Sequence, residues 1–195
     1  SMQKLFVPLL ILAGVLFGPS GAAVAQTRPA DAIERFIGSY VGTAVAERVG
    51  ADGVEQRDLD VTIARYRQTG FLIRWITVVL GPSGQRAGAD MRRRALEEEF
   101  VPSSEMPGVY VLAPTGGLFT RAETPNPLKG EPMRWATIKG DKLSVYSVAI
   151  LPDGEAEMQI YYRTLLPDGN LKSEFVRTEN DRPVVRVTGQ LTRAR

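Results

Sequence analysis

The side chains available for chemistry are limited first by two residue types that the chain lacks. Its 195 residues include neither histidine nor cysteine. The usual ligand sets for zinc, copper and haem are therefore missing. So are the Ser-His-Asp and Cys-His arrangements of nucleophilic catalysis. Oxygen-only cation sites and carboxylate, tyrosine or lysine chemistry remain possible, but we predict no metal and no cofactor.

The acidic residues do not form a catalytic pair in the sequence pattern. Glu97, Glu98 and Glu99 are consecutive, and consecutive residues of a strand point to opposite faces. They would not converge as the acid and base of a hydrolase do. Asp153 and Asp168 each precede a glycine but lack the spacing of a twelve-residue calcium loop. We therefore predict no catalytic residue and a protein that is not an enzyme.

Large aromatic side chains are the main candidates for contacts with a ligand. Alternation places Trp75, Trp135 and Tyr162 on apolar strand faces, which we expect to point inward. Inward rings either fill a core or line a ligand cavity. The same interpretation puts Tyr161 and Arg163 in an outer row. The predicted ligand-binding residues are Trp75, Trp135, Tyr146, Tyr162, Phe175, Arg65 and Arg177.

The two arginines of this set each end a largely apolar strand face. Arg65 follows Leu59, Val61 and Ile63 in alternation, and Arg177 ends a similar face. A guanidinium can bind a carboxylate or phosphate head group through two parallel hydrogen bonds, while an apolar tail lies among aromatic rings. The alternative is that both arginines lie at the rim of the fold, in water.

Charge and length narrow the possible partners. Lys and Arg total 24 against 22 Asp and Glu, a net charge of +2. This balance provides no electrostatic footprint for nucleic acid. The length suits one domain with a substantial core.

The N-terminal segment has the pattern of an export signal. Lys4 precedes an apolar run over residues 5–17, and Ala23-Val24-Ala25 gives a small-residue cleavage site. The run is shorter than the roughly 20 residues of a membrane span, although a retained anchor is the alternative. Ser1 resembles a cloning remnant. We predict a signal peptide over residues 1–25, cleaved after Ala25, and one domain over residues 26–195 in the periplasm or outside the cell, with no stable membrane span.

The rest of the chain predicts a short helix followed by a meander of strands. Asp31 is a plausible N-cap, and Gly38 supplies a stop. Alternation of period two then continues to the C-terminus, and Leu-Pro-Asp-Gly turns at residues 151–154 and 166–169 lie at hairpin spacing. Closure would remove exposed strand edges. We predict an all-β, up-and-down antiparallel barrel of about 8–10 strands with a short N-terminal helix.

Three segments fit this pattern less well. Residues 91–100 contain strong helix formers, but we favour a strand because both neighbouring segments are strands. Residues 81–89 and 123–132 are rich in Pro and Gly, which is typical of loops.

The start of the predicted barrel resembles a known superfamily. Gly38-Ser39-Tyr40 follows the short helix, and it is similar to the Gly-x-Trp that opens the first strand of lipocalins, with Tyr in place of Trp. The chain thus resembles an exported, bacterial, lipocalin-like barrel of the calycin superfamily. The resemblance implies that a basic residue near the end of the last strand, here Arg193, packs over the Tyr40 ring. It also implies an interior that holds an apolar small molecule or is filled by side chains.

Two functions follow as hypotheses. The first is a periplasmic protein that binds a hydrophobic or amphipathic small molecule, such as a lipid, fatty acid or isoprenoid, inside the barrel. A barrel of eight or more strands can hold a small ligand. The second is an envelope protein-interaction or inhibitor module, with a solid barrel and recognition by the two long loops.

Overall fold

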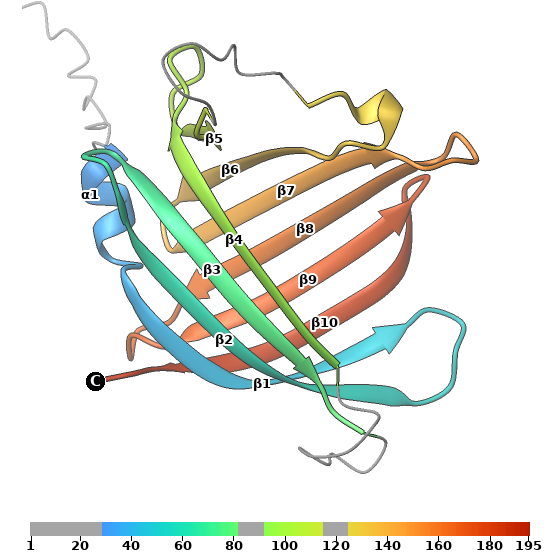
Figure 1. Ribbon diagram of the computed structural model, residues 1–195. Helices are drawn as coiled ribbons and strands as arrows, with labels where there is room; N and C mark the ends of the chain where they lie inside the picture. The colour runs from blue at the N-terminus through green and yellow to red at the C-terminus, as the bar shows by residue number, and fades with distance from the viewer. Residues whose placement is uncertain (1–28, 82–91, 115–124) are drawn as a thin grey trace, which may run out of the picture.

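The computed structural model describes residues 29–81, 92–114 and 125–195 (Figure 1). The predicted signal peptide and nearly all of loop 81–89 lie outside these residues. The described part begins with helix α1 (Pro29–Glu34) and includes a short 3-10 helix, η1 (Pro127–Lys129). Its strands are β1 (Gly38–Arg48), β2 (Val54–Tyr66), β3 (Gly70–Val79), β4 (Arg92–Pro102), β5 (Val109–Leu112), β6 (Met133–Lys139), β7 (Lys142–Ile150), β8 (Ala156–Leu165), β9 (Leu171–Glu179) and β10 (Arg182–Arg193). No helix in these three stretches is long and apolar enough to cross a membrane.

The strands form one closed antiparallel barrel. Their order around it is β1-β10-β9-β8-β7-β6-β5-β4-β3-β2, so each strand pairs with its neighbours in the chain and β1 pairs with β10. The predicted all-β, up-and-down barrel with a short N-terminal helix is confirmed. Segment 92–102 is strand β4, so the strand interpretation of that ambiguous stretch was correct.

The repeated Leu-Pro-Asp-Gly turns fix the register of the C-terminal strands. Gly154 and Gly169 have φ values of 85° and 86°, a left-handed conformation that favours glycine. The amide of each donates to the carbonyl of the leucine that opens its turn, at 2.9 Å. The second turn aligns Leu165 with Leu171 across β8 and β9, and this register determines which side chains of both strands face inward.

An apolar core fills the end of the barrel that α1 covers, which we call the closed end (Figure 1). Phe36, Phe71 and Phe100 are fully buried there, and the Phe71 and Phe100 rings stack with centroids 5.2 Å apart. The core includes Ile33 of α1 and Tyr40 of β1. Among the described residues, the closed end is therefore a packed apolar core.

The closed end also contains the arginine that the superfamily resemblance predicted. The Arg193 guanidinium lies 5.1 Å from the centroid of the Tyr40 ring. Its Nε donates to the Tyr40 hydroxyl at 3.1 Å and its Nη2 to the Arg35 carbonyl at 2.7 Å. The Tyr40 hydroxyl donates in turn to the Phe36 carbonyl at 2.8 Å. The predicted packing of Arg193 over Tyr40 is confirmed.

Candidate ligand cavity

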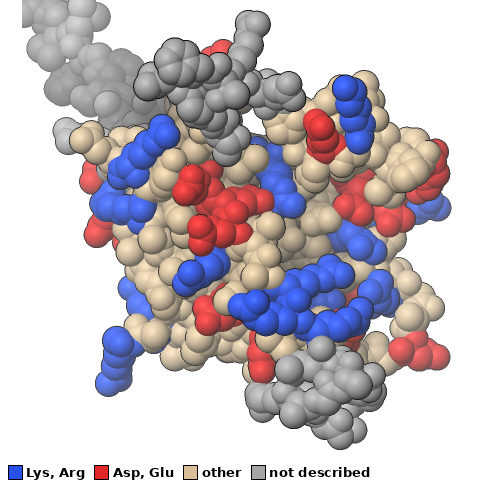
Figure 2. Space-filling view, in the orientation of Figure 1, with Lys and Arg blue, Asp and Glu red and all other residues tan. Residues whose placement is uncertain are grey.

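The half of the barrel away from α1 encloses a cavity of about 210 Å³. Side chains of β1–β4 and β8–β10 line it. Its charged lining consists of six arginines and one glutamate: Arg48, Arg57, Arg92, Arg94, Arg163, Arg177 and Glu55. A dense group of basic side chains is visible on the surface near the lower ends of β3 and β4 (Figure 2). The lining is therefore strongly cationic, although the whole chain is nearly neutral.

Exposure increases along the cavity from a buried floor to an open mouth. Arg163 of β8 is 3% exposed and lies next to the apolar core. At the far ends of β2 and β4, the Arg92 side chain is 64% exposed. We call the end formed by Arg48, Glu55, Arg57 and Arg92 the mouth. A ligand that reached Arg163 through the mouth would leave water almost completely.

Arg163 is the most unusual side chain of the cavity. Its Nε and Nη1 atoms are buried and have no hydrogen-bond partner among the described residues, and it makes no ion pair with them. Its guanidinium lies 5.5 Å from the centroid of the Tyr161 ring. Burial lowers the pKa of Arg163 to about 10, so the group remains charged at pH 7. A buried cation without a counter-charge is costly, and an anion in the cavity would supply the missing partner.

A second arginine, Arg177 of β9, lies nearer the mouth and is partly paired. Its Nη2 is 4.0 Å from the Glu179 carboxylate, while its buried Nε has no hydrogen-bond partner in the described part of the chain. Its neighbour across the strands is Gln159, whose amide donates to Glu157 at 2.7 Å. This side of the rim therefore already contains carboxylates.

Three aromatic rings form the apolar wall of the cavity. Tyr161 of β8 lies between Trp75 and Phe175, with ring centroids 5.1 Å and 4.6 Å away. The Tyr161 hydroxyl donates to Gln159 at 3.2 Å, and burial raises the pKa of Tyr161, so the phenol is neutral at pH 7. These rings offer a ligand an apolar surface next to the buried charge of Arg163.

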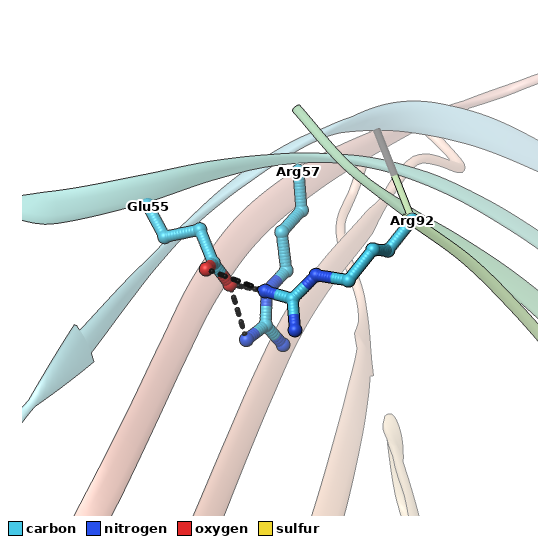
Figure 3. Close-up of polar contacts among 3 residues, drawn as sticks. All are labelled: Glu55, Arg57 and Arg92. Atoms are coloured by element: carbon cyan, nitrogen blue, oxygen red, sulfur yellow. Dashed lines mark hydrogen bonds and ion pairs between the residues drawn. The ribbon is translucent and has the colours of Figure 1, made fainter. Parts of the chain in front are cut away.

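A carboxylate occupies the centre of the mouth. Nε and Nη2 of Arg57 donate to Glu55 Oε1 at 3.0 Å and 2.7 Å, and Arg92 Nη2 lies 3.5 Å from Glu55 Oε2 (Figure 3). Glu55 and Arg57 are two residues apart on β2 and therefore share its inner face. Arg92 reaches them from β4.

Beside the cavity, a buried ion pair links β4 and β6. Arg134 Nη1 donates to Glu98 Oε1 at 2.5 Å, and the Glu98 side chain is 9% exposed. Burial raises the pKa of Glu98, and the nearby Arg134 partly opposes this effect. The second oxygen, Glu98 Oε2, has no hydrogen-bond partner among the described residues.

The structure brings together three of the seven predicted ligand-binding residues. Trp75, Phe175 and Arg177 line the cavity. Arg65 does not, because it lies at the closed end and pairs with Glu34 of α1. Whether any of these residues binds a ligand remains a prediction.

The other three predicted residues point out of the barrel, so their inward assignment was wrong. Trp135 stacks on Tyr146 with centroids 5.2 Å apart, while the adjacent Ala136 of β6 is fully buried in the core. Tyr162 packs on the outside with Lys142, whose Nζ is 4.9 Å from the ring centroid. Strands β6–β8 carry apolar residues on both faces, and composition alone therefore does not determine which face turns inward.

The same error concealed the two most informative residues of the site. Tyr161 and Arg163 were assigned to an outer row, but both line the cavity. The signal that could have placed them was the turn at residues 166–169. Counting along both strands from the pairing of Leu165 with Leu171 puts Tyr161 opposite Phe175. Residues that pair directly across two strands point to the same face of the sheet. The inward position predicted for Phe175 therefore applies to Tyr161 as well.

Comparison with known proteins identifies the fold but not a family. No protein-family model and no curated protein matches the chain. The chain is similar in structure to the S-type phycobiliprotein lyase CPES from Guillardia theta, with a TM-score of 0.52, 10% identity, and coverage of 87% of this chain and 94% of the lyase. It is also similar to Rv2717c from M. tuberculosis, with a TM-score of 0.50, 17% identity, and coverage of 87% and 99%. These similarities support a calycin-like barrel and do not single out the lipocalins.

One prediction is corrected by this comparison. We predicted a protein that is not an enzyme, but a barrel of the same fold belongs to a lyase, which is an enzyme. The lack of histidine and cysteine excludes particular catalytic schemes, and it does not exclude catalysis in a barrel of this kind.

Proposed function

We propose that the barrel binds a small amphipathic molecule through an anionic group, a carboxylate or a phosphate. The anion pairs with Arg163 at the floor of the cavity, and the apolar part lies against Trp75, Tyr161 and Phe175. The observation that carries this proposal is the buried guanidinium of Arg163, whose Nε and Nη1 have no partner among the described residues.

Electrostatics favour an anion over a neutral ligand. Six arginines line the cavity with one glutamate, and low-dielectric walls strengthen the attraction between a cationic lining and an anion. A planar guanidinium also matches the two oxygens of a carboxylate or phosphate. A neutral apolar molecule would leave Arg163 unpaired and would gain only the contacts with the aromatic wall.

The cavity size limits the ligand. At about 210 Å³, it is smaller than the roughly 300–1,000 Å³ typical of sites for drug-sized molecules. A ten-carbon chain with one acidic head group is therefore a reasonable probe. Among the lipid-like ligands that the sequence suggests, a short fatty acid or a short isoprenoid acid or phosphate fits this limit better than a bulky lipid.

Intrinsic fluorescence provides a direct test, because the chain has two tryptophans and only Trp75 lines the cavity. In a Trp135→Phe protein, Trp75 emission reports on the cavity. We expect decanoate and decyl phosphate to shift this emission with saturable binding, and 1-decanol to bind at least about ten-fold more weakly. Comparing the two acids distinguishes a carboxylate from a phosphate ligand.

The decisive variant is Arg163→Met in the same background. It removes the charge but keeps an apolar side chain of similar length, and we expect it to weaken binding of the better acid at least about ten-fold. Arg186→Met is the matched control, because Arg186 is exposed on the outer face of β10. Equal binding of acids and alcohol, or undiminished binding to Arg163→Met, would refute the proposal.

The cavity argues against the alternative of a solid barrel that acts only through its loops. Of those two loops, residues 81–89 lie almost wholly outside the described part of the chain. The described part of the other contains η1, with Leu128 80% exposed, and nothing there identifies a protein partner.

We also propose that the protein is exported to the bacterial envelope. The support is the signal-like pattern of residues 1–25, which lie outside the described structure. Expression of the full chain in a bacterial host should yield a periplasmic protein that begins at Gln26 by N-terminal sequencing. An unprocessed cytoplasmic product would contradict this proposal.

A further inference from the structure

We infer that the ligand carries two acidic groups, and that the second replaces the Glu55 carboxylate between Arg57 and Arg92 at the mouth. This inference rests on the proposed function, because it assumes that a first acidic group pairs with Arg163. It adds a second binding position and a class of ligand, the amphipathic diacids.

The mouth already shows how an acidic group is held there. Arg57 directs Nε and Nη2 at a single carboxylate oxygen, at 3.0 Å and 2.7 Å, and Arg92 approaches the other oxygen at 3.5 Å (Figure 3). Glu55 is the only acid among the residues that line the cavity. Its carboxylate is partly exposed, so it can swing into water when a ligand carboxylate takes its place.

The barrel register connects this position with the floor. From Arg57, the paired residues across the wall are Ala44, Gly189, Ser173 and then Arg163. All three residues between the arginines are small, and Ser173 lines the cavity. Arg57 and Arg163 thus lie at the two ends of one row of paired residues, which we call the track, and both line the same cavity.

The length of the track sets the separation of the two acidic groups. Four strand steps of about 4.8 Å place the two arginine backbones about 19 Å apart along the wall. The guanidinium groups are closer together than that, because both side chains extend inward. An extended ten-carbon diacid carries its two carboxylates at opposite ends of one apolar chain, so it is a probe that can reach both positions.

The opposite rim is less suited to a second acidic group. Arg177 has Glu179 beside it, and Gln159 donates to Glu157. Two carboxylates on that side would repel an incoming anion. At the mouth, by contrast, Glu55 faces Arg57 and Arg92, with Arg48 also in the lining.

Calorimetric titration of the full chain with decanedioate and decanoate tests the inference. The two probes have the same chain length and differ by one carboxylate. We expect decanedioate to bind at least about ten-fold more tightly, since it makes one more charge-assisted contact. Arg57→Gln should reduce decanedioate affinity to near that of decanoate, and it should weaken decanoate binding much less than decanedioate binding.

Glu55→Gln should act in the opposite direction. Without the internal carboxylate, decanedioate affinity should rise about three- to ten-fold, and decanoate affinity should rise less because decanoate has no second acidic group for the mouth. Glu47→Gln is the matched control, because Glu47 is exposed on the outer face of the neighbouring β1 and loses the same charge. A similar gain from Glu47→Gln would indicate a general charge effect and would overturn the displacement of Glu55.

The outcomes separate this inference from the proposed function. If decanoate and decanedioate bind equally well, and Arg57→Gln affects neither, the second position is refuted while binding at Arg163 stands. If neither acid binds, the proposed function fails as well. Circular dichroism and melting temperature verify that each variant is folded, which we expect because Glu55 and Arg57 lie at the mouth and outside the apolar core.

Discussion

The two ends of the barrel use the same residue type in opposite ways. At the closed end, Arg193 covers the Tyr40 ring and donates to the Tyr40 hydroxyl and the Arg35 carbonyl. In the cavity, Arg163 is more deeply buried, yet its Nε and Nη1 have no partner in the described part of the chain. The difference indicates that Arg193 stabilises the fold, whereas Arg163 costs stability unless an anion binds.

The packing around the two arginines differs in the same sense. Phe71 at the closed end contacts both Phe100 and Tyr110, each with centroids 5.2 Å away. Phe175 packs on Tyr161 but also borders the cavity. One half of the barrel is a close-packed core, and the other keeps large side chains beside empty space.

The largest expected effect contrasts these two phenylalanines. Phe71→Ala should lower the free energy of unfolding by about 3–5 kcal/mol, because it opens a cavity in a packed core. Phe175→Ala should lower it by only about 1–2 kcal/mol, because part of that side chain already faces space. Urea denaturation of both variants measures the difference. Equal losses would show that the two halves are equally well packed.

The next contrast exchanges the two arginines for methionine. Arg193→Met should reduce stability by about 2 kcal/mol, since it removes the hydrogen bonds to the Tyr40 hydroxyl and the Arg35 carbonyl and the packing over the Tyr40 ring. Arg163→Met should increase it by about 1–3 kcal/mol in the absence of ligand, because an apolar side chain replaces an unpaired buried charge. The melting temperatures should therefore move in opposite directions.

Arg163→Lys is the control for this pair. It retains a buried cation and should give no gain in stability. If Arg163→Met instead destabilised the protein as much as Arg193→Met, Arg163 would be a structural residue, and the comparison between the two ends would not hold. A gain in stability together with a loss of acid binding would be typical of a site kept for function.

The sequence predicted the closed end better than the cavity. Alternation and the two Leu-Pro-Asp-Gly turns were sufficient for the barrel, and the Gly38-Ser39-Tyr40 pattern placed Arg193 over Tyr40. These features are local or lie in strands with one clearly apolar face. The resemblance to the calycin superfamily could therefore be seen without knowing which side chains fill the barrel interior.

The cavity was harder to predict because it departs from the rule that inward faces are apolar. On β8, Gln159, Tyr161 and Arg163 look like an exposed row, while Ile160 and Tyr162 look like a core face. The structure has the reverse arrangement. A binding site places polar side chains inside the barrel. An assignment that relies on hydrophobicity therefore predicts the wrong inward face for the strands that form the site.

The smallest expected effect concerns the buried Glu98 beside the cavity. Burial is the main influence on this carboxyl and raises its pKa above the usual 4.5, despite the opposing effect of Arg134. The folded protein therefore holds this proton more tightly than the unfolded chain does. The stability that Glu98 contributes is complete below the unfolded pKa and is lost as the pH rises through the folded pKa.

The Glu98→Gln side chain does not titrate, so the stability of this variant should fall less than that of the wild type as the pH rises above 4.5. Urea denaturation across this pH range measures both slopes, and Glu97→Gln, on the outer face of β4, is the control. Identical slopes for wild type and Glu98→Gln would show that Arg134 fully compensates for the burial of Glu98.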